Sequence, residues 1–322
     1  MAEMIVERLR ESEEAAVRFK LSTLVLGCAP GSSEVRGLQE QVRRSARVEG
    51  LLSERQADGR IPLNPYAKWM GAHWVLATLA DIGYPPGDES LIPLREQVYE
   101  WLLGSGHLKS VKTIQGRVRR CASQEGNAVY AMLTLGLADE RTDELVRRLV
   151  EWQWPDGGWN CDKTPRASNS SFYESLIPLR ALALHARLTG NAESQAAAKR
   201  AAEVFLKRHL FKAEHDGSLI NEEWVKLHYP CYWRYDILVA LKVMAEAGFV
   251  NDKRCRAALE LLEAKRLPDG GWPAEGKYYR TAASAKTGRS TVAWGAQGAR
   301  RMNEFVTVEA LGVLAAAGGK RI

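Results

Sequence analysis

The tetrapeptide Asp-Gly-Gly-Trp occurs twice in this chain, beginning at Asp156 and again at Asp269. Each copy follows one amphipathic stretch and precedes an apolar one. Asp favours the first position of a tight turn, and Gly accepts the positive φ that other residues resist. We therefore expect two equivalent turns between helices, each with its Trp folded back as an apolar plug. A turn repeated at wide spacing predicts an array of similar units.

Other Asp-Gly pairs extend this spacing. They occur at Asp58 and Asp216, and a degenerate Gly-Ser-Gly-His stretch begins at Gly104. The gap from Asp58 to Asp156 is 98 residues, or twice 49, and the later gaps are 60 and 53. A unit of about fifty residues is long enough for two helices and a loop.

Two kinds of helix are predicted within each unit. Leu145, Leu149 and Trp152 form an apolar stripe, so that the helix before a turn has one solvated face. The segments after the turns are apolar almost all round, which is typical of helices buried on both sides. The predicted inner helices cover about 15–27, 69–82, 124–137, 171–189, 231–247 and 304–317, and the outer ones 32–55, 90–103, 139–154, 193–210 and 251–266.

This alternation predicts an all-α fold, in which residues 1–322 form a single (α/α)6 toroid domain with a slightly incomplete outer ring. Sparse Pro in the apolar segments and the lack of alternating Val, Ile, Thr and Tyr runs agree with a helical chain. An open solenoid of helix hairpins is the alternative, although a solenoid usually needs polar capping units.

The composition of the chain limits which binding partners and which cellular compartment are expected. The net charge of +6 is mild for a surface rich in Arg and Glu, and does not indicate a nucleic-acid partner. Five scattered cysteines without a Cys-x-x-Cys pair fit a reduced, cytoplasmic protein. We predict no metal site and no cofactor from them. No apolar run approaches the roughly 20 residues that span a bilayer. The oligomeric state is left open.

The first turn carries a family resemblance. Gln153-x-x-x-Gly157-x-Trp159, preceded by Arg147 and Arg148, resembles the QW motif of squalene and other triterpene cyclases and the corresponding turn of protein prenyltransferase β subunits. The resemblance implies an α/α toroid whose inner helices surround a central cavity, with ligands at the mouth where helix N-termini converge. Such N-termini suit anions such as diphosphate.

The catalytic motifs of these families are missing. The chain contains neither Asp-x-Asp-Asp nor Asp-Asp-x-x-Asp, and Arg266 replaces the Gln in the second copy of the turn. Cys231-Tyr232 resembles the Cys-Tyr stretch of the prenyltransferase zinc site, but Tyr229 occupies the position of its Asp. The resemblance thus implies a fold and a ligand cavity, and other residues must supply the chemistry.

The segment from His228 to Asp236 is the strongest site candidate. It concentrates hydrogen-bonding groups at the expected start of an inner helix, where leaving them unpaired is costly. On a helix, Tyr232 and Asp236 share a face, and a His with a nearby Asp provides a general base and its orienting partner. Cys231 beside His228 is an alternative nucleophile pair. The predicted catalytic residues are His228, Asp236, Glu174, Tyr229, Tyr235 and Asp162.

Further polar residues near the starts of inner helices are predicted to bind the ligand. They are Lys68, Trp69, His73, Arg120, Glu125, Asn160, Tyr232, Trp233, Arg289 and Glu304, of which Lys68, Arg120 and Arg289 would hold an anion. A purely structural role is the alternative interpretation for several of these residues. His73 also fits a core histidine, the basic run from Lys109 to Arg120 fits a solvated loop, and Glu174 fits a helix cap.

Three functions follow from this pattern. The first is an enzyme that uses acid–base chemistry on a small polar or anionic molecule, isoprenoid-like by resemblance, in the central cavity. The second is a carbohydrate-active α/α-barrel enzyme with Asp162 and Glu174 as its carboxylate pair. The third is a non-catalytic toroid that binds a ligand or a protein. A dry aromatic wall favours an isoprenoid, a polar trough with a Trp favours a sugar, and mouth residues paired to one another without a cavity favour the third.

Overall fold

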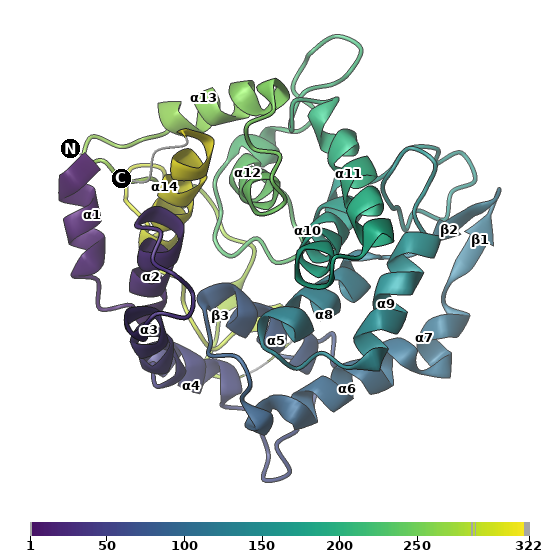
Figure 1. The fold of residues 1–322 in the computed structure, drawn as a ribbon, viewed down its shortest axis with the longest axis horizontal. Coiled ribbons are helices and arrows are strands. Elements are labelled where there is room, and N and C mark those ends of the chain that lie inside the picture. The colour runs from purple at the N-terminus through teal and green to yellow at the C-terminus, as the bar shows by residue number, and fades with distance from the viewer. Residues whose placement is uncertain (1, 285, 287, 319–322) are drawn as a thin grey trace. The chain divides into compact units, whose positions relative to one another are not determined.

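The computed structural model describes residues 2–284, 286 and 288–318 (Figure 1). This part of the chain is mostly helical, which confirms the all-α class. The helices are α1 (Ala2–Arg10), α2 (Ala15–Lys20), α3 (Ser33–Arg43), α4 (Ala46–Leu52), α5 (Ala72–Ile82), α6 (Ile92–Leu103), α7 (Ser105–Lys109), α8 (Ser123–Thr134), α9 (Glu140–Glu151), α10 (Phe172–Thr189), α11 (Ala192–Leu206), α12 (Ile237–Glu246), α13 (Arg256–Ala264) and α14 (Glu304–Gly318).

Two short strand pairs accompany the helices. Strand β1 (Lys112–Ile114) pairs antiparallel with β2 (Arg117–Arg119), with Lys112 opposite Arg119. Strand β3 (Arg280–Thr281) lies parallel to β4 (Arg289–Ser290). Among the described residues, no helix is both long and apolar enough to cross a bilayer.

The contacts divide the chain into two compact units. Unit 1 comprises residues 1–53, 81–85 and 208–322, and unit 2 comprises residues 54–80 and 86–207. In unit 1, α14 packs against α2, against the π-helical turn Leu21–Val25 that extends α2, and against α12. In unit 2, α8 packs against α9 and α10, and α10 packs against α11 (Figure 1).

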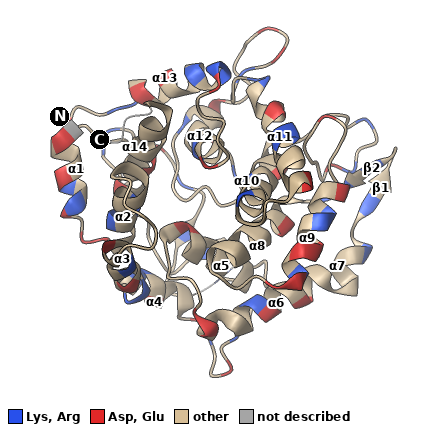
Figure 2. Cartoon of the chain, in the orientation of Figure 1, with Lys and Arg blue, Asp and Glu red and all other residues tan. Residues whose placement is uncertain are grey.

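The predicted contrast between neighbouring helices is present. Helix α9 buries Leu145 and Leu149 and exposes Glu151, whereas α8 buries residues on most of its circumference. Figure 2 shows the same difference, because α9 carries charged residues along its length and α8 is almost free of them. Burial of apolar side chains contributes about 25 cal/mol per Å², so these two packed faces stabilise unit 2.

The first Asp-Gly-Gly-Trp turn is a plug, as predicted. Trp159 is 1% exposed, and its indole donates a hydrogen bond to Leu149 O at 2.9 Å, at the end of the preceding helix. Its backbone N–H donates to Ser175 Oγ at 3.0 Å on the following helix. Gly157 has φ +104°, and a Cβ there would lie 2.3 Å from Arg200 O. The turn therefore requires glycine at this position and joins three helices.

The second copy in unit 1 repeats these bonds. The Trp272 indole donates to Leu262 O at 2.7 Å, and its backbone N–H donates to Thr307 Oγ1 at 2.9 Å. Gln153 of the first copy donates to two carbonyls, those of Gly157 and Ala197, at 2.7 and 2.8 Å. Its counterpart Arg266 instead lies over the Trp272 ring at 4.2 Å. Each unit thus contains one copy of the same structural repeat.

The other predicted turns differ from the two Asp-Gly-Gly-Trp turns. At Asp58 the turn keeps the backbone bonds from Gly59 N to Gln56 O and from Gln56 N to Arg60 O, and buried Ile61 takes the place of Trp. At Asp216 the loop closes through Ala213 N and Ser218 O instead. Gly104 does not form a turn of this type, because it is the N-cap residue of α7.

Several predicted helix boundaries were wrong. The inner helix expected at 231–247 begins only at Ile237, because Asp236 is its N-cap and its side chain accepts Val239 N–H. The helix expected at 69–82 begins at Ala72. The outer segment 32–55 contains two helices, each capped by a serine. Helix α1, which carries charged residues in most of its turns, was not predicted.

A buried ion network in unit 1 joins α2, α12 and α14 to Asp81. Lys20 on α2 and Lys242 on α12 both contact Glu309 Oε1 on α14, at 2.5 and 2.7 Å. Both also contact Asp81 near the end of α5, at 3.2 and 2.7 Å. Burial raises the pKa of Glu309, but the two ammonium groups lower it by more, so it lies below its usual value. The network therefore carries balanced charge in the core of this unit.

Candidate functional site at the start of helix α8

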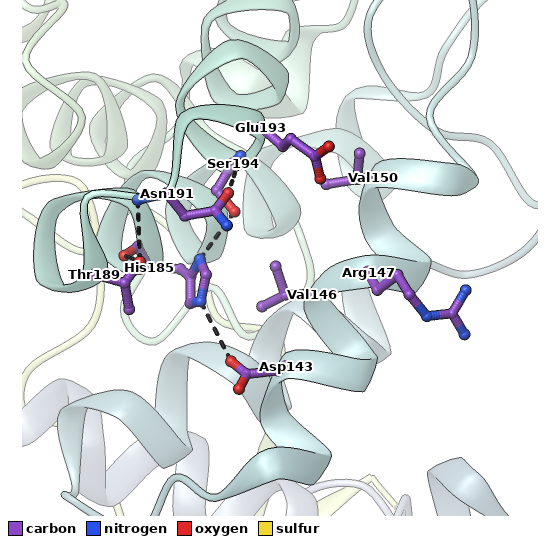
Figure 3. A pocket seen from close by; sticks show the side chains of 9 residues that line it. All are labelled: Asp143, Val146, Arg147, Val150, His185, Thr189, Asn191, Glu193 and Ser194. Carbon is purple, nitrogen blue, oxygen red and sulfur yellow. Dashed lines mark hydrogen bonds and ion pairs between the residues drawn. The ribbon is translucent and has the colours of Figure 1, made fainter.

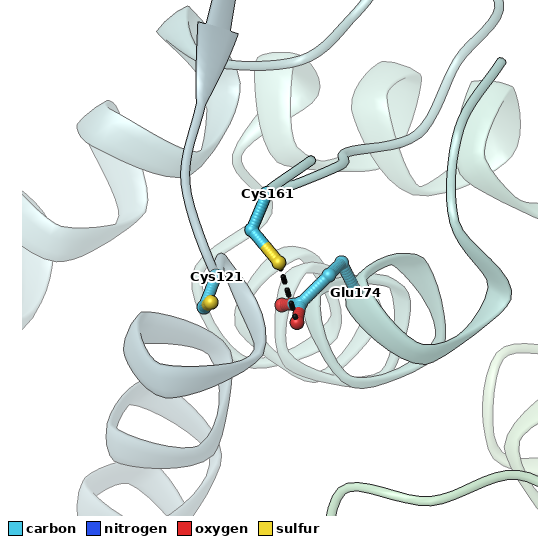
Figure 4. Close-up of side chains that lie close together, drawn as sticks. All are labelled: Cys121, Cys161 and Glu174. Atoms are coloured by element: carbon cyan, nitrogen blue, oxygen red, sulfur yellow. Dashed lines mark hydrogen bonds between the residues drawn. The ribbon is translucent and has the colours of Figure 1, made fainter. Parts of the chain in front are cut away.

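In unit 2 the chain just before α8 lies beside the loop that follows the first Trp turn. Arg119 and Asn160 form a parallel β-bridge, and Arg120 N donates to Asn160 O at 3.2 Å. The bond between Arg120 and Asn160 places the residues that follow them, Cys121 and Cys161, next to each other. Figure 4 shows both side chains beside Glu174, which comes from the first turn of α10.

The three side chains converge on one point. The two Sγ atoms and a Glu174 oxygen all lie within 4.8 Å of one another. Cys161 Sγ is 3.6 Å from Glu174 Oε1, and Ser123 N–H holds the other carboxylate oxygen at 3.2 Å. Glu174 is 7% exposed, whereas both thiols are half-buried. The group is thus rigid on its carboxylate side and reachable on its thiol side.

Protonation is unevenly shared in this group. The neighbouring Cys161 thiol and burial raise the pKa of Cys121. The Cys121 thiol lowers the pKa of Cys161, so Cys161 has the greater thiolate character. Burial raises the pKa of Glu174. The arrangement holds three acidic groups, each able to bind a metal, close together.

A second polar group lies on the other side of the α8 start. Glu125 is fully buried, and its Oε1 accepts from His107 Nε2 at 2.7 Å and from Arg120 Nε at 3.2 Å. Arg120 also donates to Ser110 Oγ at 3.1 Å and to Gln124. Burial raises the pKa of Glu125, while the bond from His107 and the Arg120 charge lower it by more. Glu125 is therefore a carboxylate.

Three buried polar atoms nearby lack a hydrogen-bond partner within the described part of the chain: Glu125 Oε2 and both ring nitrogens of His73. Burial lowers the pKa of His73 to about 3, so the ring is neutral at pH 7. A neutral imidazole still has one N–H donor, and leaving it unbonded costs about 1–3 kcal/mol. Buried atoms of this kind usually meet a water or a ligand group.

An open pocket of about 520 Å³ adjoins these groups. It is lined by Glu100, Trp101, Gly104, Gly106, His107, Ser110, Arg120 and Gln124. The Trp101 ring is 5.1 Å from the ring of His107 and 5.5 Å from that of His73. The unpartnered atoms of His73 and Glu125 therefore lie just behind the pocket wall. Five of the eight lining residues have polar or charged side chains, and one is a Trp.

The predicted His228–Asp236 pair does form in unit 1, but not on a helix. Residues 228–236 are a loop, in which Tyr229-Pro230 is a cis peptide and Tyr232 has φ +54°. The expected helical face shared by Tyr232 and Asp236 is therefore wrong. The loop folds back so that His228 Nδ1 lies 3.2 Å from Asp236 Oδ2, and His228 stacks on Tyr278 at 4.1 Å.

Asp236 is saturated with structural bonds. Its Oδ1 accepts from Val239 N at 2.9 Å, and its Oδ2 accepts from His228 N at 2.8 Å and from Cys231 Sγ at 3.2 Å. Burial, and then the Asp236 charge, raise the pKa of Cys231 well above its usual value, so its thiol stays protonated. These residues do not fit the prenyltransferase zinc site, because Asp236 already accepts from two backbone N–H groups, the His228 ring and the Cys231 thiol, and that thiol is protonated.

The tyrosines and the tryptophan of this loop have structural partners. Tyr229 donates to Asp81 Oδ2 at 3.0 Å and stacks on Phe305. Tyr235 donates to Leu210 O at 2.6 Å. Arg234 lies over the Trp233 ring at 5.1 Å. Burial raises the pKa of Tyr229, Tyr232 and Tyr235, so all three stay protonated.

Of the other predicted residues in unit 2, Asn160 and Asp162 belong to a surface turn. Asn160 Oδ1 accepts Asp162 N–H, and the exposed Asp162 accepts Thr164 N–H at 2.8 Å. The Asp162 carboxylate is thus bonded within its own exposed turn, whereas Glu174 is buried, and the two do not form the predicted carboxylate pair. Lys68 lies over the ring of its neighbour Trp69 at 5.6 Å, and Trp69 packs edge-on against Trp74.

Arg289 and Glu304 belong to unit 1. Arg289 begins β4, and Glu304 begins α14 and accepts a hydrogen bond from Ser12 at 2.9 Å. The basic run from Lys109 to Arg120 is not simply a solvated loop. It contains the β1–β2 hairpin, and Arg119 is 1% exposed with its guanidinium 4.4 Å from the Trp154 ring.

A second pocket of about 370 Å³ is lined by a serine, a histidine and an aspartate whose side chains contact one another in that order (Figure 3). His185 Nδ1 is 2.9 Å from Ser194 Oγ, and its Nε2 is 3.5 Å from Asp143 Oδ1. Ser194 is fully buried in the first turn of α11, and the Asp143 side chain is 75% exposed. In a catalytic triad the nucleophile must be accessible and the carboxylate that orients the histidine must be fixed. This group meets neither requirement, so its role is to link the helices that carry its residues.

Sequence reasoning missed several residues at the α8 start. Cys121 and Cys161 lie 40 positions apart and match no ligand-spacing motif. The sequence pattern places His107 in a degenerate turn. One indication was present: Cys161 follows the Trp turn by two residues, at a point that the turn holds firmly.

Comparison with known proteins adds no assignment. No protein-family model matches the chain, and no curated protein matches it.

Proposed function

We propose that this chain is an α/α-toroid enzyme that binds a small hydrophilic molecule, of the carbohydrate class, in the pocket at the start of α8. The single observation that carries the proposal is the pocket of about 520 Å³, with five polar or charged lining residues and one Trp, beside buried polar atoms that lack partners among the described residues. Ligand pockets commonly combine an apolar surface with a few directed polar groups.

The toroid is part of the proposal. Its support is the alternation of nearly uncharged helices with amphipathic ones, and the two equivalent Trp turns. The resemblance to terpenoid cyclases and protein prenyltransferases rests on the first of these turns. The five polar or charged lining residues argue for a sugar-like ligand over the isoprenoid that those families suggest, because an isoprenoid needs a dry aromatic wall.

Each lining residue has a definite role in this proposal. Gln124 and Ser110 present hydrogen-bonding groups to ligand hydroxyls, and Trp101 offers a ring face for a sugar to stack on. Arg120 adds positive charge suited to an acidic or strongly polar substituent. His107 is the acid–base group, because Glu125 holds its Nε2 at 2.7 Å and fixes the orientation of the imidazole. Arg120 Nη2 lies 3.0 Å from the other nitrogen, Nδ1, so the ligand must draw Arg120 away before Nδ1 exchanges a proton with it.

A non-catalytic binding module is the second candidate. One observation favours it: Arg120, Glu125 and His107 are already paired with one another. Against it, the pairing leaves an open pocket in front of the group. Binding without turnover would identify this second function.

The proposal is tested by titrating neutral sugars, uronic acids and prenyl diphosphates into the protein by calorimetry and thermal shift. Gln124→Ala should weaken sugar or uronide binding about 10-fold, since one hydrogen bond contributes about 0.5–1.5 kcal/mol. Gln195→Ala, an exposed residue on α11, is the matched control and should bind as the parent does. Binding of prenyl diphosphates alone, or equal affinity in Gln124→Ala, would contradict the proposal.

A further inference from the structure

The group formed by Cys121, Cys161 and Glu174 has the chemistry of a metal site. Thiolates are soft ligands that favour zinc, and a carboxylate oxygen is a common further ligand. Among the described residues, the hydrogen bonds of this group run from Cys161 Sγ and from Ser123 N to Glu174, so no bond to a residue outside it explains why the two thiols converge. Glu174 is buried beside the two half-buried thiols.

The distances fit a tetrahedral ion. Zinc bonds of about 2.3 Å to sulfur and about 2.1 Å to oxygen, at the tetrahedral angle, separate the two ligand atoms by about 3.6 Å. Cys161 Sγ and Glu174 Oε1 are 3.6 Å apart. The third atom, Cys121 Sγ, lies within 4.8 Å of both, and a change of one thiol rotamer closes such a gap. Figure 4 shows the Cys161 sulfur and the Glu174 carboxylate pointing toward each other.

Three separate elements hold the ligands in place before any ion binds. The bridge between Arg119 and Asn160 fixes the backbone two residues before Cys121 and one residue before Cys161. The buried Trp159 anchors the loop that carries Cys161. Ser123 N–H holds the second oxygen of Glu174 at 3.2 Å. Such outer bonds orient the first ligands and reduce the entropy lost on binding.

We propose that Cys121, Cys161 and Glu174 bind one zinc ion, with the fourth tetrahedral position open to water or to a ligand atom. Three protein ligands and an open position are the pattern of catalytic zinc. On binding, each thiol releases its proton to solvent and forms a sulfur–zinc bond, and the carboxylate forms the third bond. The site carries one net negative charge when loaded, and Arg120 stands beside it in the sequence. This inference goes beyond the proposed function and does not depend on it.

The test uses the full chain, stripped of metal and kept reduced. Titration with Co²⁺, a spectroscopic substitute for zinc, should give one bound ion per chain with sulfur-to-cobalt charge-transfer absorption, and Zn²⁺ should abolish that absorption. Cys161→Ser and Cys121→Ser should each lower the Co²⁺ affinity at least about 100-fold, because losing a ligand costs no less than losing an outer-shell bond. Cys255→Ser and Cys28→Ser, in unit 1, are controls and should bind Co²⁺ as the parent does.

A second measurement uses the parent protein alone and does not depend on how the variants fold. With Zn²⁺ present, Cys121 and Cys161 should be protected from iodoacetamide, as quantified by mass spectrometry, while Cys28 reacts at an unchanged rate. Unchanged alkylation of Cys121 and Cys161, or a charge-transfer spectrum that survives in the Cys121→Ser/Cys161→Ser double variant, would overturn the proposal. Gln124→Ala should leave the Co²⁺ spectrum intact, so failure of the pocket and failure of the metal site are distinguishable.

Discussion

At the scale of single residues, His73 illustrates how burial decides a role that residue type leaves open. On an apolar helix it fits both a core histidine and a ligand group. The structure places it at 2% exposure among the rings of Tyr66, Trp74 and Trp101, with both nitrogens unpartnered within the described residues. Its position behind the pocket wall links it to the candidate site.

The lowered pKa of His73 predicts a stability change with pH. Because the pKa falls from 6.5 to about 3 on folding, the unfolded chain binds a proton in that interval that the folded protein does not. The free energy of unfolding should therefore fall as the pH drops below 6.5. By pH 4 this one residue should cost about 3 kcal/mol.

The measurement is urea unfolding of the parent and of His73→Leu at pH 7 and pH 4. The variant should lose about 3 kcal/mol less than the parent between the two pH values. Only the difference between the two pH slopes matters, so any packing defect in the variant cancels. Parallel slopes for parent and variant would show that His73 does not titrate in this way.

Asp236 makes a second prediction at this scale. Asp236→Ala removes the cap of α12 and leaves buried donors of His228 and Val239 without a partner. The loss of a cap costs about 1 kcal/mol, and each orphaned buried donor about 1–3 kcal/mol. We expect the unfolding free energy in urea to fall by about 3 kcal/mol or more.

Asp162→Ala is the matched control, because that carboxylate is exposed and holds one turn N–H. It should change stability by less than about 1 kcal/mol. A small effect of Asp236→Ala, similar to that of the control, would mean that Asp236 is free for chemistry instead of serving as a cap.

At the scale of elements, the Trp turn and the helix after it form one unit in both repeats. Ser175→Ala and Thr307→Val each remove the hydroxyl that accepts the Trp backbone N–H, 16 and 35 residues along the chain. Each substitution leaves a buried N–H unbonded and should cost about 1–3 kcal/mol in urea unfolding.

The losses of unfolding free energy in Ser175→Ala and Thr307→Val should agree within about 1 kcal/mol if the two repeats are energetically equivalent. Ser218→Ala, in an exposed turn, is the control and should cost less than about 0.5 kcal/mol. A cost in only one repeat would show that the shared bonds differ in strength despite their shared geometry.

Helix positions followed from periodicity, but several helix starts did not. The apolar segments of α8, α10 and α14 lie where the pattern indicated, because a helix with a buried face needs apolar residues at regular positions in the sequence. The start of α12 did not, because a loop of aromatic residues has the same apolar character as a buried helix. Its cap, Asp236, is recognisable only once the loop is seen to fold back.

At the scale of the whole molecule, the ion network of unit 1 yields a prediction about cooperativity. Glu309→Leu leaves Lys20, which is 3% exposed, with a weaker ion pair in the core. Breaking one partner of a buried pair typically costs about 3–5 kcal/mol. Hydrogen exchange measured by mass spectrometry should show faster exchange in α2, α12 and α14 of Glu309→Leu, with a smaller change in α8–α11.

The double variant Lys20→Met/Glu309→Leu tests the cause. Replacing both charges with apolar groups should recover most of the lost protection, since an apolar pair often substitutes for a buried ion pair without loss. Equal loss of protection in both units, or no recovery in the double variant, would contradict the view that the effect arises from a stranded charge in unit 1.

The sequence by itself determined the helical class, the repeated Trp turn and most helix positions, because these depend on periodicity and on turn chemistry that neighbouring residues carry. It also indicated Arg120, Glu125, Glu174 and His73 as polar residues near helix starts. Only the tertiary structure decided that Cys121 meets Cys161, that His107 holds Glu125, and that Asp236 serves as a cap. These contacts join segments separated by many residues, and burial and pairing between such segments leave no local pattern in the chain.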